Sequence, residues 1–113
     1  MGRNLVILSA GRDPELLTQW AGPLMAAGYQ VFSAIAPEET MEHISNRGFD
    51  LVLLCYSLTK EERRRLLLLL RICAPSTPVL MLAENEGIDY EDGVRRVQAV
   101  PEQILAAVHI SLS

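Results

Sequence analysis

Few side chains in this sequence can carry out chemistry, and the most prominent of them follow short apolar runs. Cys55 ends the run 49–55, and Cys73 is the only other cysteine. A thiol becomes a nucleophile or redox sensor when a nearby cation lowers its pKa and solvent reaches it, and Arg12 is a candidate neighbour of Cys55. A cysteine at a strand end otherwise packs as a small hydrophobic side chain, which is the interpretation we favour.

The remaining candidate groups match no catalytic or metal-binding pattern. His43 and His109 fall in different predicted helices, and neither has a second ligand at metal-binding spacing. Ser9, Ser33 and Ser57 are not set in the glycine-flanked elbow that exposes a nucleophilic serine. The sequence therefore predicts no metal site, no cofactor and no enzymatic activity.

Composition excludes several other classes of protein. The chain has 113 residues, half of them apolar, and a formal net charge of −4. This length and apolar content predict one folded domain over residues 1–113. The negative charge argues against nucleic-acid binding, which needs a basic surface. We find no apolar run long enough for a membrane span and no secretory signal peptide, so we expect a cytoplasmic protein.

The elements that position these groups alternate along the chain. Apolar runs predict strands at 5–8, 29–34, 49–56, 78–83 and 95–100, and helical periodicity predicts helices at 14–27, 37–47, 60–74 and 101–112. Asp13 is suited to cap the first helix, with Pro14 at its first position. Thr59 and Glu62 have the spacing of a capping box at the start of the third helix.

Alternating strands and helices predict an α/β fold with an open, doubly wound parallel sheet. We expect the flavodoxin-like arrangement of five strands, in the order 2-1-3-4-5. Its functional crevice lies at the carboxyl ends of the strands. Residues 84–94 show little helical periodicity, so a fourth helix in that region is predicted to be shortened or missing.

Three segments together resemble a known family. They are the strand Arg3-Asn4-Leu5-Val6-Ile7-Leu8, the helix start Asp13-Pro14-Glu15-Leu16-Leu17, and the strand Phe49-Asp50-Leu51-Val52-Leu53-Leu54-Cys55. Their order and spacing resemble the receiver (CheY-like) domain of bacterial response regulators, and the resemblance covers nearly the whole chain. It implies two-component (phosphorelay) signal transduction through protein partners.

The resemblance also implies where a phosphorylation site would lie. Receivers carry a magnesium-binding acidic pair after strand one, a phosphoacceptor Asp after strand three, a Thr or Ser after strand four, and a Lys before Pro after strand five. The acidic pair falls on Ser9 and Ala10 counted from the strand, or on Gly11 and Arg12 counted back from the helix, and Asp13 is the only acidic residue there. The phosphoacceptor, hydroxyl and Lys positions hold Cys55, Ala83 and Val100.

These replacements predict a pseudo-receiver, a non-catalytic module that works by protein–protein contact without aspartyl phosphorylation. Magnesium needs clustered oxygen ligands, which the replaced positions do not supply. Two alternatives stay open: a thiol-based redox switch at Cys55, and a phosphate-responsive receiver with a displaced carboxylate at Asp13 or Asp50. Asp50 starts its strand, at the wrong end of the sheet for the second alternative.

The third helix contains a candidate interface. Five successive leucines, 66–70, follow three arginines, and leucines at 100° intervals point in all directions around a helix. At least one leucine should therefore be exposed, either as an ordinary surface residue or within an interface next to basic residues. We expect a protein partner or a homodimer contact at Arg63, Arg64, Leu66, Leu67, Leu68 and Leu70.

Overall fold

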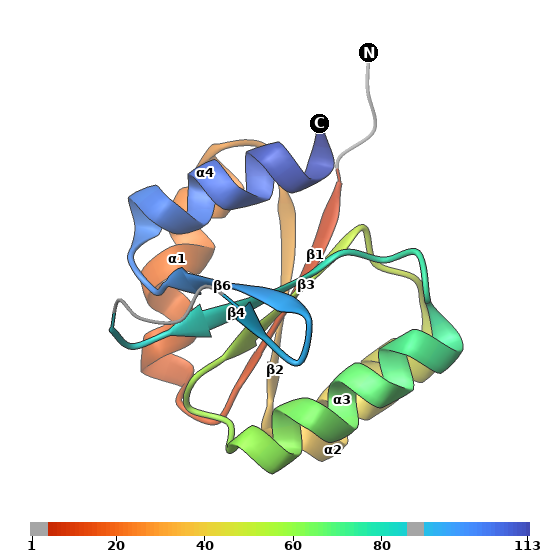
Figure 1. Cartoon of the computed structure of the whole chain (residues 1–113). Coiled ribbons are helices and arrows are strands. Elements are labelled where there is room, and N and C mark those ends of the chain that lie inside the picture. The colour runs from red at the N-terminus through yellow and green to blue at the C-terminus, as the bar shows by residue number, and fades with distance from the viewer. Residues whose placement is uncertain (1–4, 86–89) are drawn as a thin grey trace.

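A computed structural model of the chain describes residues 5–85 and 90–113. Strands and helices alternate as the sequence predicts (Figure 1). In chain order the elements are β1 (Val6–Gly11), α1 (Pro14–Ala26), β2 (Gln30–Ile35), α2 (Ala36–Asn46), β3 (Leu51–Cys55), α3 (Lys60–Cys73), β4 (Val79–Ala83), β5 (Tyr90–Glu91), β6 (Val94–Gln98) and α4 (Pro101–Leu112).

The sheet has the order β2-β1-β3-β4-β6-β5. Its first five strands are parallel, which confirms the flavodoxin-like order predicted from the sequence. The sixth strand, β5, was not predicted, and it pairs antiparallel with β6 at the edge of the sheet. β3 lies at the centre of the parallel part, and all five of its residues are buried.

Helices cover both faces of the sheet. α1 and α4 lie together on one face, and α2 and α3 lie together on the other (Figure 1). Each face of the sheet has its own hydrophobic core, and alternate residues of β3 point into one or the other. Leu51, Leu53 and Cys55 pack beneath α1 and α4, and Val52 and Leu54 pack beneath α2 and α3. Within the described residues, no helix is long and apolar enough to cross a membrane.

The predicted helix caps are confirmed. The Asp13 side chain accepts a hydrogen bond from the Glu15 amide at 3.0 Å, ahead of Pro14. Thr59 and Glu62 form the complete capping box at the start of α3. After α1, Gly28 has a φ of +100°, a conformation that glycine adopts without the steric cost that a Cβ would impose.

β1 is longer at its carboxyl end than predicted. It continues through Ser9 to Gly11, whereas the apolar run alone ends at Leu8. Ser9 can lie in the buried strand because the Trp20 indole donates a hydrogen bond to its Oγ atom at 3.1 Å, and both side chains are fully buried.

The described residues between β4 and β6 contain no helix, in line with a shortened or missing fourth helix; residues 86–89 lie outside them. A hairpin occupies part of this segment instead. Asp92 and Gly93 have φ values of +49° and +80° and connect the paired residues Glu91 and Val94. A two-residue connection with two positive φ values matches the twist of antiparallel strands. The hairpin begins the last parallel strand at Val94, one residue before the predicted start.

Candidate functional site

The carboxyl ends of β1, β3 and β4 meet in a tightly packed site at Gly11, Cys55 and Ala83. Cys55 is fully buried and Ala83 is 5% exposed. A Cβ atom placed on Gly11 would lie 2.8 Å from Ser57 Oγ and 3.1 Å from Cys55 Cβ. A larger residue at position 11 would therefore require the Ser57 side chain to move and Cys55 to shift by a few tenths of an ångström. The strand end is packed around a residue without a side chain.

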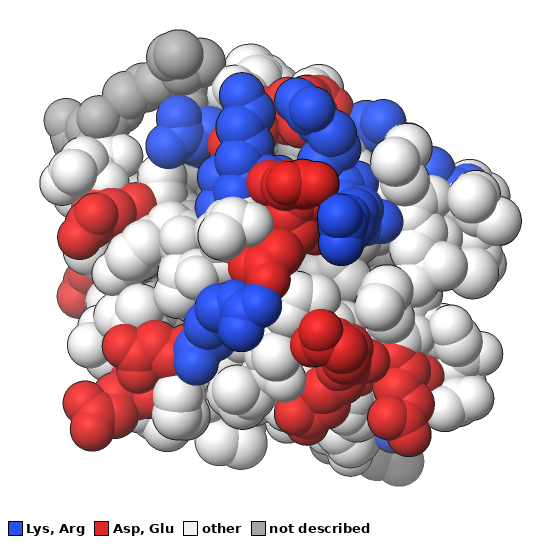
Figure 2. Space-filling view, turned by 90° about the horizontal axis from the view of Figure 1, so that it is seen from below, with Lys and Arg blue, Asp and Glu red and all other residues white. Residues whose placement is uncertain are grey.

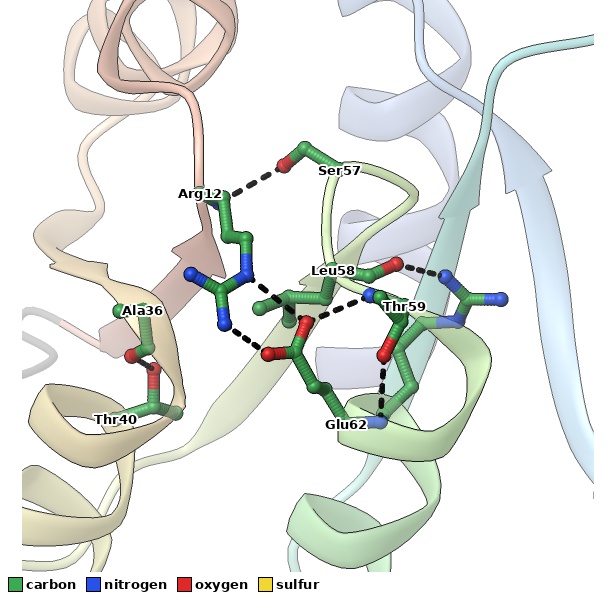
Figure 3. Close-up of polar contacts among 8 residues, drawn as sticks. Arg12, Ala36, Thr40, Ser57, Leu58, Thr59 and Glu62 are labelled. Carbon is green, nitrogen blue, oxygen red and sulfur yellow. Dashed lines mark hydrogen bonds and ion pairs between the residues drawn. The ribbon is translucent and has the colours of Figure 1, made fainter.

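Arg12 extends from the end of β1 across this site to α3. Its backbone N–H donates to Ser57 Oγ at 3.0 Å, and its guanidinium Nε donates to Glu62 Oε1 at 3.0 Å (Figure 3). A second bond joins Arg12 Nη2 to Glu62 Oε2. This two-point ion pair connects the β1–α1 loop to the first turn of α3.

Glu62 has two roles because the same carboxylate completes the capping box. Its Oε1 accepts a hydrogen bond from the Thr59 amide at 2.8 Å, and its own amide donates to Thr59 Oγ1 at 3.1 Å (Figure 3). The Arg12 hydrogen bond, followed by the Thr59 amide, lowers the pKa of Glu62 from 4.5 to about 2. The hydrogen bond to Glu62 in turn raises the pKa of Arg12. The Arg12 guanidinium is thus already paired with a carboxylate.

The Glu62 interactions predict a specific acid dependence of stability. Because the folded pKa lies below 4.5, the stabilisation is present above about pH 4.5 and is lost as the pH falls towards 2. Glu62→Gln is expected to lower the free energy of unfolding at pH 7 by up to about 1 kcal/mol, since Arg12 is half exposed. Urea unfolding at a series of pH values should show a shallower decline for the variant below pH 4.5.

The adjacent Glu61 supplies a matched control, because its ion pair with Arg65 is exposed on both sides. Glu61→Gln should leave the acid dependence almost unchanged. Equal slopes for wild type and Glu62→Gln would contradict the assignment of this stabilisation to the Arg12–Glu62 pair.

The acidic pair of the receiver pattern is missing at the end of β1, whether it is aligned with Ser9 and Ala10 or with Gly11 and Arg12. Ser9 and Ala10 are buried within the strand, where Ser9 accepts the Trp20 hydrogen bond. Gly11 and Arg12 take part in the packed strand end and the ion pair described above. Asp13 is exposed, and its carboxylate caps α1.

The positions after β4 and β6 are also without the polar groups of a phosphorylation site. Ala83 presents a methyl group, and its carbonyl accepts a hydrogen bond from the Ala99 amide at 2.8 Å. Val100 is the N-cap residue of α4 but provides no side-chain hydrogen bond there. The site therefore has no hydroxyl at position 83 and no amine at position 100.

Asp50 lies at the opposite, amino end of β3. Its Oδ2 accepts a hydrogen bond from the Val6 amide at 2.8 Å, which joins the beginnings of β1 and β3. The length of β3 separates this carboxylate from Cys55.

Polar groups do remain at the rim of the site. The pKa of the Tyr56 hydroxyl is raised, first by burial and then by nearby acidic side chains such as Glu84 and Asp13. Among the described residues, no three His, Cys, Asp or Glu side chains come together as metal ligands would. His43 packs beside the rings of Phe32 and Phe49, with its ring centroid 6.3 Å from each.

The structure corrects part of the predicted interface on α3. Leu66, Leu67 and Leu70 are buried in the core beneath α2 and α3, so they are not available to a partner. The exposed apolar side chains of this helix are Leu68 (53%) and Ile72 (79%). These two are four residues apart and share the outer side of α3.

The arginines of α3 hold the β5–β6 hairpin. Arg63 donates from Nε and Nη2 to the two oxygens of Glu91, at 2.8 and 3.0 Å, and from Nη1 to the Leu58 carbonyl. Arg64 Nε lies 3.5 Å from Asp92 Oδ2, and Arg71 Nη2 donates to the Asp92 carbonyl at 2.9 Å. Seen from below, Lys and Arg side chains gather on one side of the molecule with acidic side chains among them (Figure 2).

Arg63 was predicted to lie in an interface, but it is an internal contact of the fold. Its side chain is 14% exposed and that of Glu91 is 13% exposed. The hydrogen bond from Arg63 lowers the pKa of Glu91. Sequence reasoning missed Glu62, Glu91 and Asp92 as partners of the arginines. The available signals were the Thr59–Glu62 capping box and the Asp92-Gly93 turn pair, and neither signal identifies which arginine is near.

Solved structures with the same fold include several receiver domains. The chemotaxis response regulator CheY4 of Vibrio cholerae matches with a TM-score of 0.85 and 17% identity, over 97% of this chain and 100% of that chain. The receiver domain of the Francisella response regulator 1452 matches with a TM-score of 0.82 and 17% identity, over 96% and 97%.

The receiver domain of the hybrid histidine kinase CckA has the highest identity of these three, 23%, with a TM-score of 0.79 over 96% of this chain and 99% of that chain. The fold is thus the CheY-like receiver fold. No protein-family model and no curated protein matches the sequence.

Proposed function

We propose that this chain is a pseudo-receiver, a non-catalytic module of two-component-type signal transduction that acts by protein–protein contact. The observation that carries the proposal is the content of the strand-end site. Cys55 is buried there beside Gly11, and the nearby Arg12 guanidinium is paired with Glu62.

Phosphoryl transfer to a carboxylate needs a nucleophilic oxygen, a metal ion held by oxygen ligands, and groups that balance the developing charge. Here the corresponding positions present a thiol, a methyl group and an isopropyl group, at Cys55, Ala83 and Val100. Position 11 holds glycine rather than a metal-binding carboxylate, and Ser57 and Cys55 pack closely against it. Packing and one internal ion pair occupy the place of the reaction centre.

The β5–β6 hairpin supports a second part of the proposal, that the domain keeps one conformation until a partner binds. The family resemblance implies that the region after β4 carries the output of a receiver. In this chain, Arg63, Arg64 and Arg71 connect that region to α3. A phosphate signal would have to break these contacts, whereas a partner can recognise the arrangement as it stands.

The surface that we propose for partner contact is the outer ridge of α3, formed by Leu68 and Ile72 with Arg64 and Arg65 beside them. Exposed apolar side chains next to arginine are common in protein interfaces. The partner is either another signalling protein or a second copy of this chain. The net charge of −4 disfavours nucleic acid.

Neither alternative function has comparable support. A redox switch needs a thiol that solvent can reach, and Cys55 is fully buried. A displaced phosphoacceptor would be Asp13, which caps α1, or Asp50, which lies at the far end of β3.

The test is a titration of the ¹⁵N-labelled chain with magnesium and then with beryllofluoride, which mimics an aspartyl phosphate. We expect the amide resonances of residues 9–13, 55–58 and 83–85 to stay in place, because the site lacks the ligands for either ion. A receiver domain with an intact site, titrated in parallel, controls for the reagent. Saturable shifts clustered at these residues would overturn the proposal.

A further inference from the structure

We propose that the chain has a binding pocket for a small organic anion with an apolar body, located between the end of α3 and the β5–β6 hairpin. This inference does not depend on the proposed signalling function. The pocket is a hollow of about 360 Å³ at the amino ends of β4 and β6.

The walls of the hollow combine apolar side chains with positive charge. Leu67, Leu70, Val79 and Val94 line its apolar part, and Arg71 and Arg95 line it as well. None of the described lining residues is Asp or Glu, and the nearby carboxylates of Glu91 and Asp92 are bound to Arg63 and Arg64. The lining is therefore complementary to an anion.

Arg71 is held in place without losing its charge. Its Nη2 donates to the Asp92 carbonyl at 2.9 Å, and the same atom would lie 3.8 Å from a Cβ added to Gly93. A carbonyl is a neutral acceptor, so this contact orients the guanidinium, and among the described residues Arg71 forms no ion pair with a carboxylate. A guanidinium has five N–H donors, and one of them accounts for this bond.

Arg95 provides the second cation. It is exposed, and among the described residues it forms no ion pair with a carboxylate. In the hairpin it lies directly opposite Tyr90, which also lines the hollow. Two arginines without paired carboxylates and an aromatic ring next to an apolar wall suit a ligand that has a carboxylate at one end and a hydrocarbon body at the other.

The volume limits the size of the ligand. Small-molecule sites span about 300–1,000 Å³, and this hollow lies at the lower end of that range. A compound of the size of an arylalkyl carboxylate fits this limit, whereas a nucleotide with its several phosphates needs more space and more cations.

The experiment uses the complete chain, labelled with ¹⁵N, and 3-phenylpropionate as the probe. We expect saturable shifts at the amides of Leu70, Thr77 and Val94, which surround the hollow. The neutral analogue 3-phenylpropionamide has the same body without the charge and should bind at least about tenfold more weakly, since a charge-assisted hydrogen bond is lost. Equal binding of acid and amide, or no saturable binding of the acid, would overturn the proposal.

A pair of variants localises the site. Arg95→Gln removes a cation that lines the hollow, and it should weaken 3-phenylpropionate binding about tenfold. Arg65→Gln removes the same charge from the outer surface of α3, away from the hollow, and should leave binding unchanged. Unchanged affinity in Arg95→Gln, or equal losses in both variants, would show that binding occurs elsewhere or through net charge alone.

Discussion

Cys55→Asp is expected to destabilise the domain by about 3 kcal/mol and not to create a phosphorylation site. The substitution restores the side chain that a receiver carries at this position. In this chain, however, Cys55 is fully buried in the core beneath α1 and α4, where it packs with Leu53, Leu82 and Leu17. A carboxylate placed there loses its hydration and gains no charged partner, which is among the costliest single changes in a folded protein.

In a receiver, a magnesium ion held by acidic neighbours and a nearby cation balance the charge of such a carboxylate. Neither is available around position 55 in this chain. No acidic pair at the end of β1 is available to hold a magnesium ion beside position 55, because Gly11 has no side chain and a Cβ added to it would lie only 3.1 Å from Cys55 Cβ. The Arg12 guanidinium is bound to Glu62 through two hydrogen bonds. Using it for position 55 would break the link between the β1–α1 loop and α3.

The destabilisation should depend on pH in a predictable direction. Burial raises the pKa of the introduced carboxyl above its unfolded value of about 3.9, so the protonated form is favoured in the folded state. The loss of stability is therefore largest at pH 7 and becomes smaller as the pH falls towards 4. Chemical unfolding at pH 7 and at pH 4.5 measures both quantities.

Cys55→Ser is the matched control, because it introduces polarity at nearly the same volume without a charge. It should cost about 1–2 kcal/mol with no pH dependence in this range. A Cys55→Asp variant that is as stable as wild type at pH 7 and binds beryllofluoride would show that the receiver site is intact apart from one residue. The pseudo-receiver proposal would then fail.

Arg63→Met is expected to lower the free energy of unfolding by about 2–3 kcal/mol and to loosen the β5–β6 hairpin. Arg63 and Glu91 are mostly buried, with 14% and 13% of their side chains exposed, and they are joined by two hydrogen bonds. Removing the arginine leaves the partly buried Glu91 carboxylate without its hydrogen-bond donors, and it also removes the donor to the Leu58 carbonyl. Methionine keeps the length and apolar character of the arginine stem, so the change reports mainly on the lost charge.

A double-mutant cycle with Glu91→Gln isolates the pair. Because the pKa of Glu91 is lowered, the interaction should be present at neutral pH and should be lost in acid as Glu91 becomes protonated. Hydrogen exchange at Tyr90, Val94 and Arg95 should become faster in Arg63→Met, since their strand pairing depends on the hairpin being held against α3.

The control for this prediction is Arg65→Met, two residues further along the same helix. Its ion pair with Glu61 has both side chains exposed by more than 70%, so its loss should cost no more than about 0.5 kcal/mol. If Arg63→Met were as stable as Arg65→Met and the hairpin amides stayed protected, the ion pair would not be what keeps the region after β4 in place. That part of the proposed function would have to be abandoned.

Several features of this protein follow from local sequence alone. Apolar runs of strand length and helical periodicity between them determined the alternation of elements and hence the parallel sheet, because buried strands and amphipathic helices have different repeats. The Asp13 cap and the Thr59–Glu62 capping box were readable because both partners lie within three residues of each other. The residues that stand where the receiver pattern has its phosphorylation groups could also be read directly from the sequence, because they lie at or just after the predicted strands. They are Cys55, Ala83 and Val100.

Other features were decided only by the tertiary structure. The five leucines of α3 are equivalent in composition, and the rotation of the helix against the sheet determines that Leu66, Leu67 and Leu70 are buried whereas Leu68 is exposed. The apolar run that ends at Leu8 predicts a strand end before Ser9, whereas in the structure β1 continues because Trp20 donates a hydrogen bond to the Ser9 hydroxyl inside the core.

Ion pairing depends even more on the assembled fold. Arg12 and Glu62 are 50 residues apart, and Arg63 and Glu91 are 28 residues apart. Long charged side chains have no local periodicity that identifies their partners, so which of them meet depends on how the loops and helices pack. Packing therefore decided that these arginines hold the strand-end site and the hairpin together, whereas the sequence alone placed Arg63 and Arg64 in an interface.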